Sequence, residues 1–98
     1  MNGALAFPKP RRLVDAAYLD FIRLRPCLIE GAAAQAHHTV PVGAGGSDYR
    51  TLPLCHRHHE ELHRIGKTRF ETRYRLDITE EVIRHLELYV SALRREGK

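Results

Sequence analysis

Two stretches of the sequence decide the fold: AHHTVP at residues 36–41 and PLCHRHHEELHRIG at residues 53–66. The second stretch predicts a helix from about Cys55 or His56 to Ile65, with Gly66 suited to cap its C-terminal end. Residues four apart on a helix lie on one face, one turn apart. We therefore expect His59 and His63 to point the same way and to chelate one metal ion.

The first stretch predicts one strand of a β-hairpin. Residues 35–40 form this strand, residues 41–46 a long turn, and residues 49–54 the antiparallel partner, which Pro53 confines to a sheet edge. Adjacent side chains on a strand point to opposite faces, so His37 and His38 cannot bind the same ion unless the backbone bends. We assign His37 to the metal and His38 to a free base, and the reverse assignment stays open.

These four histidines are suited to phosphodiester hydrolysis. Three neutral imidazoles leave metal positions open for water and a phosphate oxygen, and the ion polarises the phosphate and stabilises the leaving oxygen. A histidine that titrates near neutrality can take a proton from the attacking water. Nearby arginines would neutralise charge that develops on the phosphoryl group.

The rest of the chain predicts further helices. Apolar spacing favours a helix over residues 12–25, which Pro26 ends, and another over residues 69–76. Thr79 is a plausible N-cap for the last helix. That helix should pack on the core through residues at helical spacing: Val82, Ile83, Leu86, Tyr89, Val90 and Leu93. Residues 1–11 are expected to be a loose leader within a single domain covering residues 1–98.

Basic residues are concentrated in one part of the chain. The net charge is +4, and the stretch from Arg50 to Arg75 alone holds seven basic and three acidic residues. A basic surface favours polyanions, and phosphate contacts carry affinity but little sequence information. The candidate phosphate contacts are Arg50, Arg57, Arg64, Lys67, Arg69 and Arg73.

Two classes of protein are disfavoured. No apolar run approaches the length of a membrane span, and the N-terminus lacks the features of a signal peptide. Two cysteines, Cys27 and Cys55, make a disulfide framework unlikely for a small domain. A cytoplasmic protein without membrane contact is the expectation.

The motif region resembles HNH (ββα-metal) endonucleases of phage and prophage type. The resemblance rests on AHHTVP, GGSD at residues 45–48 and PLCHRHHEELHRIG, and covers about Cys27 to Asp77, with weaker similarity from Tyr18 onward. It implies a small α+β domain in which a β-hairpin and one helix grip a single ion, packed with two or three further helices. It also implies DNA as the substrate, His38 as general base and three metal ligands, His37, His59 and His63.

The sequence departs from that family at one position. The asparagine that gives the motif its middle letter should stand about five residues before Cys55, where this chain has Arg50. Asp48 is the nearest side chain able to brace the loop or orient a histidine. The alternative is that Asp48 only caps a turn after Gly-Gly-Ser.

Many members of the HNH family carry a structural zinc ion between two CxxC-like knuckles. Here Cys27-Leu-Ile-Glu30 and Cys55-His-Arg-His58 retain one cysteine each, and zinc accepts carboxylate and imidazole ligands as well as thiolate. Cys27, Glu30, Cys55 and His58 could therefore close a tetrahedron. The alternative is that both cysteines are buried as small hydrophobic residues and no structural Zn²⁺ binds.

Two other functions compete with the nuclease. Residues 59–66 also spell HExxHxxG, and the first five positions are the zinc-metalloprotease signature, for which Glu80, Glu81 or Glu87 could supply a third ligand. A non-catalytic, metal-stabilised DNA-binding module would use the same basic stretch. The sequence does not choose among Mg²⁺, Mn²⁺, Ni²⁺ and Zn²⁺ for the catalytic ion. It also leaves open a homodimer and a recombination or packaging partner.

Overall fold

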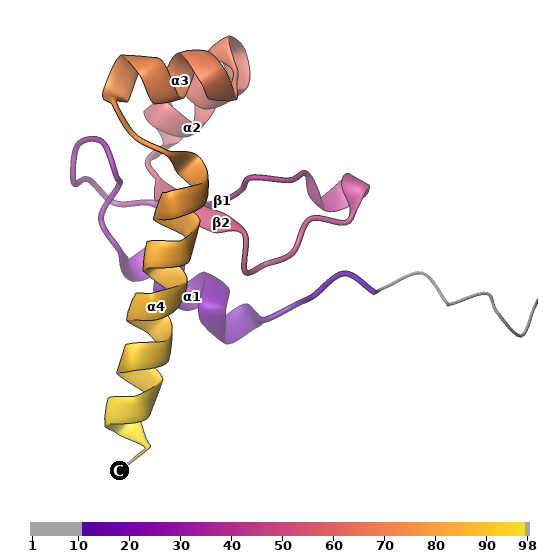
Figure 1. The fold of residues 1–98 in the computed structure, drawn as a ribbon, viewed down its shortest axis with the longest axis vertical. Helices are drawn as coiled ribbons and strands as arrows, with labels where there is room; N and C mark the ends of the chain where they lie inside the picture. Colours follow the sequence, from indigo (N-terminus) through magenta and orange to yellow (C-terminus); the bar gives the residue numbers. More distant parts are fainter. Residues whose placement is uncertain (1–10, 98) are drawn as a thin grey trace, which may run out of the picture.

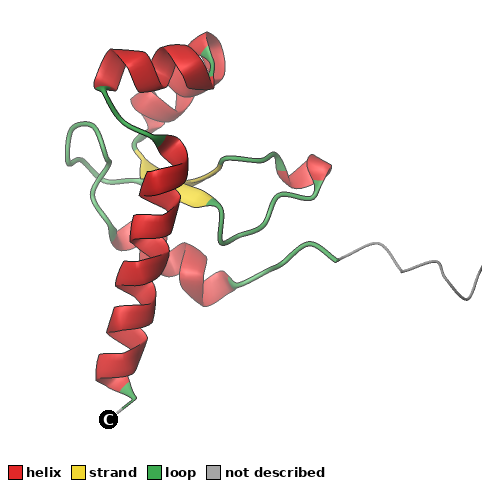
Figure 2. Ribbon diagram, viewed as in Figure 1, coloured by secondary structure: helices red, strands yellow, loops and turns green. Residues whose placement is uncertain are grey.

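The computed structural model describes residues 11–97, so residues 1–10 of the predicted leader lie outside the described part. The order of elements is α1 (Ala16–Leu24), β1 (Gln35–His38), a 3-10 helix (Val42–Ala44), β2 (Thr51–Leu54), α2 (His56–Ile65), α3 (Lys67–Tyr74) and α4 (Ile78–Glu96) (Figure 1). The predicted α+β class is confirmed. Within residues 11–97 a two-stranded antiparallel hairpin lies among four α-helices (Figure 2).

The hairpin forms where the sequence predicts it, with shorter strands. His37 pairs with Leu52 and His38 with Thr51, and one further backbone bond runs from the Thr39 N–H to the Arg50 carbonyl (2.9 Å). At Gly46 the long turn comes back to its first residues, and the Gly46 N–H donates a hydrogen bond to the Pro41 carbonyl (3.0 Å). A Cβ atom at this position would lie 1.8 Å from the carbonyl oxygen of Val40, so only glycine fits.

The core is built around β2, all of whose residues are buried. Helices α1 and α4 contact this strand, and Figure 1 shows α4 crossing the hairpin. The buried apolar cluster joins β2 to the loop before β1 and to the three C-terminal helices through Cys27, Leu52, Leu54, Cys55, Leu62, Phe70, Ile78 and Val82. Burial of such side chains on folding contributes about 25 cal/mol per Å² of apolar surface.

Helix α1 begins later than the sequence predicts. The expected start at residue 12 is wrong, because Asp15 accepts a hydrogen bond from the Tyr18 N–H (2.9 Å) and so caps a helix that starts at Ala16. The residues before α1 lie alongside the hairpin loop. There the backbone N–H of Asp48 donates a hydrogen bond to the carbonyl of Leu13 (2.9 Å). The helix ends at Leu24, before Pro26, as predicted.

Helix α2 spans His56–Ile65 and confirms the sequence prediction, with Gly66 at its C-terminal end in an extended conformation of positive φ (φ 86°, ψ 166°). Helix α3 starts directly after this glycine, two residues earlier than predicted. Gly66 therefore turns the chain sharply between two helices.

Helix α4 differs from its prediction in two respects. Thr79 is not its N-cap, since Asp77 accepts the hydrogen bond from the Glu80 N–H (3.0 Å). The expectation that all its apolar residues pack on the core is also wrong, because Ile83, Val90 and Leu93 are exposed. The helix extends beyond the hairpin, and its C-terminal half has fewer neighbours to cover it (Figure 1). Among residues 11–97, no helix is long and apolar enough to cross a membrane.

Candidate metal centre

Strand β1 sends its two histidines in different directions. The His37 side chain faces α2 and is buried, with its ring centroid 4.5 Å from that of His59 and 5.2 Å from that of His63. The His38 side chain contacts the hairpin loop instead, where its Nε2 lies 2.8 Å from Oδ1 of Asp48. The period of two along a strand explains this division.

Helix α2 supplies the other two imidazoles of the first cluster. The Nε2 atoms of His59 and His63 lie 3.1 Å apart, as the i, i+4 spacing predicts. A ligand atom from each of His37, His59 and His63 lies within 4.8 Å of the others. The sequence predicted these three as one ligand set, and the structure brings them together. Three converging imidazoles suit a divalent metal of the zinc or nickel type.

The environment favours the neutral forms of His37 and His59. Burial, followed by the nearby His59 and His63, lowers the pKa of His37 to about 4. Burial and then His63 also lower the pKa of His59. A metal ligand must be deprotonated at the coordinating nitrogen, and the lowered pKa values of His37 and His59 meet this requirement.

His38 is fixed by a buried carboxylate. Asp48 is 1% exposed and accepts hydrogen bonds from Nη1 of Arg12 (2.7 Å) and from the backbone N–H of Asp15 (2.8 Å) as well as contacting His38. Burial alone would raise the pKa of Asp48, but the hydrogen bonds from His38, Asp15 and Arg12 hold it at about 2. Asp48 therefore carries a negative charge at neutral pH, and it contacts His38 directly.

Arg50 stands at the position that the HNH motif fills with asparagine, and among the described contacts it has none with His38 comparable to that of Asp48. The backbone carbonyl of Arg50 accepts from both the N–H (2.9 Å) and the Oγ1 hydroxyl (3.0 Å) of Thr39, which closes the mouth of the hairpin loop. Of the two residues that the sequence offered in place of the asparagine, Asp48 is the one whose side chain contacts a histidine of the site.

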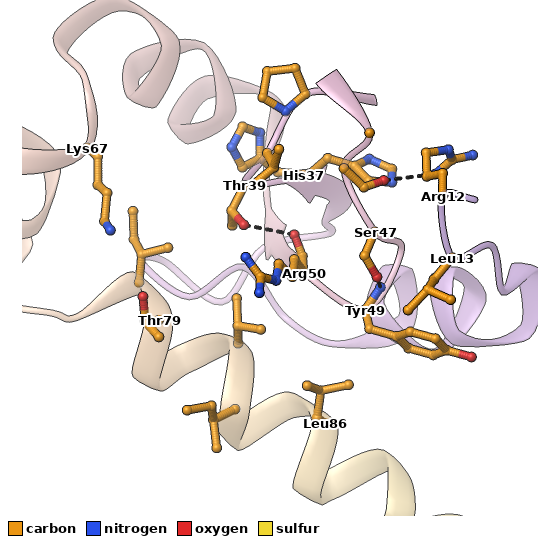
Figure 3. Close-up of a pocket in the computed structure, with 18 of the residues that line it drawn as sticks. Arg12, Leu13, His37, Thr39, Ser47, Tyr49, Arg50, Lys67, Thr79 and Leu86 are labelled. Atoms are coloured by element: carbon orange, nitrogen blue, oxygen red, sulfur yellow. Dashed lines mark hydrogen bonds between the residues drawn. The ribbon is translucent and has the colours of Figure 1, made fainter. Parts of the chain in front are cut away.

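A cleft of about 950 Å³ opens beside the histidines (Figure 3). His37, His38 and His63 line it together with two of the predicted phosphate contacts, Arg50 and Lys67. Two arginines that the sequence did not single out, Arg11 and Arg12, line it as well. The cleft thus combines the candidate base, part of the candidate metal cluster and four cationic side chains.

The other predicted phosphate contacts lie outside the lining of this cleft. Arg57 approaches Glu30 (3.6 Å), and Arg73 donates a hydrogen bond to Glu61. Arg64 and Arg69 are exposed on α2 and α3. An extended polyanion would have to leave the cleft to reach these four side chains.

A second cluster forms where the loop before β1 meets the start of α2. The Sγ atom of Cys55 lies 2.9 Å from Oε1 of Glu30 and 3.2 Å from Nδ1 of His58, and the same nitrogen is 3.8 Å from Sγ of Cys27. Cys27, Cys55 and His58 are buried and can each present a ligand atom within 4.8 Å of the others. Glu30 completes the four residues predicted from the sequence.

The chemistry of this second donor set fits zinc. Two thiols, one imidazole and one carboxylate supply four ligands of the kinds that tetrahedral zinc accepts. Burial opposes the Cys27 thiolate, but backbone N–H groups of Cys55, Glu30 and Ile29 donate to its sulfur and lower its pKa. Burial and the contact with Glu30 raise the pKa of Cys55.

Sequence reasoning missed two residues that touch the predicted site. Oε1 of Gln35 lies 2.8 Å from Nδ1 of His59, and Arg12 holds Asp48. Gln35 lies two residues before His37 on β1, so the strand period could have placed it on the metal-facing side. Arg12 lies far from the motif in sequence, and no local pattern indicates its contact.

Comparison with known proteins places the chain in a family whose function is unknown. Over 76 residues the chain is 37% identical to "Uncharacterized protein YdfU" of Escherichia coli (strain K12), a match that covers 71% of this chain and 22% of that protein. The chain thus spans about a fifth of the length of this relative. No solved structure is significantly similar to the chain. Residues 3–89 match the family described as "Protein of unknown function (DUF968)", and the chain therefore belongs to that family.

Proposed function

We propose that this chain is a metal-dependent endonuclease of the HNH type that hydrolyses DNA phosphodiester bonds. The observation that carries the proposal is the convergence of His37, His59 and His63 within 4.8 Å, on a hairpin and the helix that follows it. The order of β1, β2 and α2 supports the proposal, because the resemblance to HNH nucleases implies a hairpin followed by one helix. His38 and a basic cleft lie beside it.

Each group in the site has a chemical task in this proposal. His37, His59 and His63 would hold a divalent ion, which would supply Lewis acidity at the phosphate. His38 takes a proton from water as the new phosphorus–oxygen bond forms and the bond to the leaving oxygen breaks. Arg50 and Lys67 offset the negative charge of the phosphate within the cleft. Imidazole donors favour Zn²⁺ or Ni²⁺ in binding, whereas Mg²⁺ and Mn²⁺ prefer oxygen.

We also propose that Cys27, Glu30, Cys55 and His58 hold a structural zinc ion. The support is the set of possible ligand atoms. Three of these residues are buried and lie next to one another, and the Cys55 thiol donates a hydrogen bond to Glu30. These residues join the loop between α1 and β1 to the start of α2. A metal at this junction would stabilise a small domain that has a limited core.

The protease alternative finds less support in the geometry. In that mechanism Glu60 would act as general base at the metal, but its carboxylate is exposed and lies 3.4 Å from His56, outside the cluster. The third member of the cluster is His37 from a strand, in place of a downstream glutamate. A non-catalytic DNA-binding module would bind DNA without cleaving it, and a plasmid assay distinguishes it from a nuclease.

A plasmid assay tests the proposed function. We expect the purified protein with Mg²⁺, Mn²⁺, Ni²⁺ or Zn²⁺ to nick or linearise supercoiled DNA, and EDTA to stop the reaction. His38→Ala should abolish cleavage and leave DNA binding largely intact, whereas His56→Ala, which removes an exposed histidine of α2 outside the cluster, should cleave normally. Cleavage that persists in His38→Ala would overturn the mechanism. DNA binding without cleavage under every metal would favour the binding module, and casein degradation lost in Glu60→Ala would favour the protease.

A further inference from the structure

The carboxylate of Asp48 joins two segments that are far apart in the sequence. Its Oδ1 lies 2.8 Å from Nε2 of His38 and 2.7 Å from Nη1 of Arg12, and its Oδ2 accepts from the backbone N–H of Asp15 (2.8 Å). Arg12 also donates to the carbonyl of Gly46 (3.1 Å). The hairpin loop and the segment before α1 are therefore held together at the candidate base.

The charge of this carboxylate determines which nitrogen of His38 carries the proton. An ionised carboxylate only accepts hydrogen bonds, and here three donors surround it, one of them the guanidinium of Arg12. Nε2 of His38 must then be the protonated nitrogen. In the neutral ring, Nδ1 is left with the free electron pair, which is the group that a general base needs.

We propose that Asp48, held in place by Arg12, is a positioning residue that fixes His38 as its Nε2–H tautomer and leaves Nδ1 to take the proton from water. This inference rests on the proposed nuclease function for its catalytic meaning. The tautomer and the ring orientation are properties of the protein alone. In this chain the carboxylate of Asp48, on the hairpin loop, would then brace the site in place of the asparagine that the HNH motif has and this sequence lacks.

An interaction of this kind acts on the reaction rate more than on substrate binding. Asp48 is 1% exposed, so it is not placed to contact DNA. Loss of the carboxylate would leave the His38 ring free to rotate and to exchange tautomers. Partners that orient catalytic or metal-bound histidines typically account for about 10- to 100-fold in activity or affinity.

The tautomer can be measured without any activity. Long-range ¹H–¹⁵N NMR spectra of the histidine rings distinguish Nε2–H from Nδ1–H in the metal-free protein near neutral pH. We expect the Nε2–H form for His38 in the wild type and a mixture of tautomers in Asp48→Ala. An Nδ1–H form of His38 in the wild type would overturn the inference, whether or not the protein cleaves DNA.

Kinetics test the positioning role. With Mn²⁺ and plasmid DNA, Asp48→Ala should lower kcat about 10- to 100-fold with KM and the Kd for Mn²⁺ nearly unchanged. Asp48→Asn keeps the size of the side chain and guards against failure of Asp48→Ala to fold, and it should show a smaller loss of kcat. Asp15→Asn is the matched control, because Asp15 belongs to the same network without touching His38.

The outcomes separate the two proposals. An equal loss of kcat in Asp15→Asn and Asp48→Asn would assign Asp48 a purely structural role and overturn the inference. Wild-type protein that cleaves no DNA with any divalent metal would overturn the proposed function, and the NMR spectra would still decide the tautomer of His38.

Discussion

Both ring nitrogens of His59 are engaged. Nδ1 lies 2.8 Å from the amide oxygen of Gln35, and Nε2 lies 3.1 Å from Nε2 of His63. An amide oxygen accepts hydrogen bonds, so Nδ1 of His59 is the donor and Nε2 directs its electron pair at the cluster. Strand β1 thus supplies one candidate ligand, His37, and the residue that orients another.

Removal of the Gln35 amide should weaken the metal centre. We expect Gln35→Ala to raise the Kd for Mn²⁺ or Zn²⁺ at the histidine cluster about 10- to 100-fold, because His59 loses the group that sets its tautomer. Gln35→Glu retains an acceptor and should bind metal normally. Isothermal titration calorimetry measures both, in a Cys55→Ser background that removes the second cluster. Equal affinity in Gln35→Ala and the wild type would contradict this role.

His85 should make stability depend on pH. It is buried in α4, where its Nδ1–H donates to the Glu81 carbonyl (2.7 Å), and burial lowers its pKa below the ordinary value of 6.5. The folded state thus resists protonation of His85, and the unfolded state takes up the proton first. The stability that neutral His85 contributes is present above about pH 6.5 and is lost as the pH falls toward its folded-state pKa.

Urea denaturation at pH 7.5 and pH 5 measures this effect. The free energy of unfolding should fall less between these pH values in His85→Met than in the wild type, because methionine has no proton to take up. Parallel losses in the two proteins would exclude His85 as the source.

At the scale of elements, the junction between α2 and α3 depends on one glycine. Gly66 has φ 86° and ψ 166°, a backbone region that is essentially restricted to glycine. A Cβ atom there would meet nothing within 4 Å, so the whole penalty of a substitution is backbone strain.

We expect Gly66→Ala to reduce the free energy of unfolding by about 1–3 kcal/mol. Gly43→Ala is the control, because that glycine also has open space around it and its φ is not positive. Thermal unfolding followed by circular dichroism compares the two. A Gly66→Ala protein as stable as Gly43→Ala would show that the junction tolerates another backbone conformation.

Local chemistry explains which elements the sequence could predict. Helix α2 was predictable because its histidine spacing and its C-terminal glycine act within a few residues. The start of α1 is also set locally, because Asp15 is a good N-cap residue and bonds to the N–H of Tyr18, and the predicted start at residue 12 overlooked this signal. At α4, Asp77 and Thr79 are both good N-cap residues, and local sequence does not decide between them.

The same distinction applies to the candidate site. The grouping of His59 with His63 follows from one helix turn, and strand alternation separates His37 from His38. The contact between Asp48 and Arg12 spans 36 residues and forms only when the segment before α1 lies along the loop. Such contacts leave no periodic trace in a single sequence.

For the whole molecule, the cysteine cluster links the loop before β1 to the start of α2. Metal binding to residues that lie apart in the unfolded chain contributes directly to folding free energy. We therefore expect removal of zinc by a strong chelator to lower Tm by more than about 5 °C, since 1 kcal/mol corresponds to roughly 4–8 °C for a domain of this size.

Metal analysis of variants tests whether the proposed zinc ion binds at the cysteine cluster. After dialysis, Cys55→Ser should lose one equivalent of zinc relative to the wild type, whereas His59→Ala should retain that equivalent. Equal zinc content in Cys55→Ser and the wild type would remove the structural zinc proposal.

The most direct test of the central claim is the initial rate of Ni²⁺-dependent plasmid nicking in three proteins, because imidazole ligands favour this ion over Mn²⁺. Wild type and His56→Ala should cleave at the same rate, because His56 is exposed on α2 outside the cluster. His59→Ala should fall to the rate measured in EDTA, since it removes one of the three convergent imidazoles. Cleavage by His59→Ala at the wild-type rate would contradict a catalytic metal centre at His37, His59 and His63.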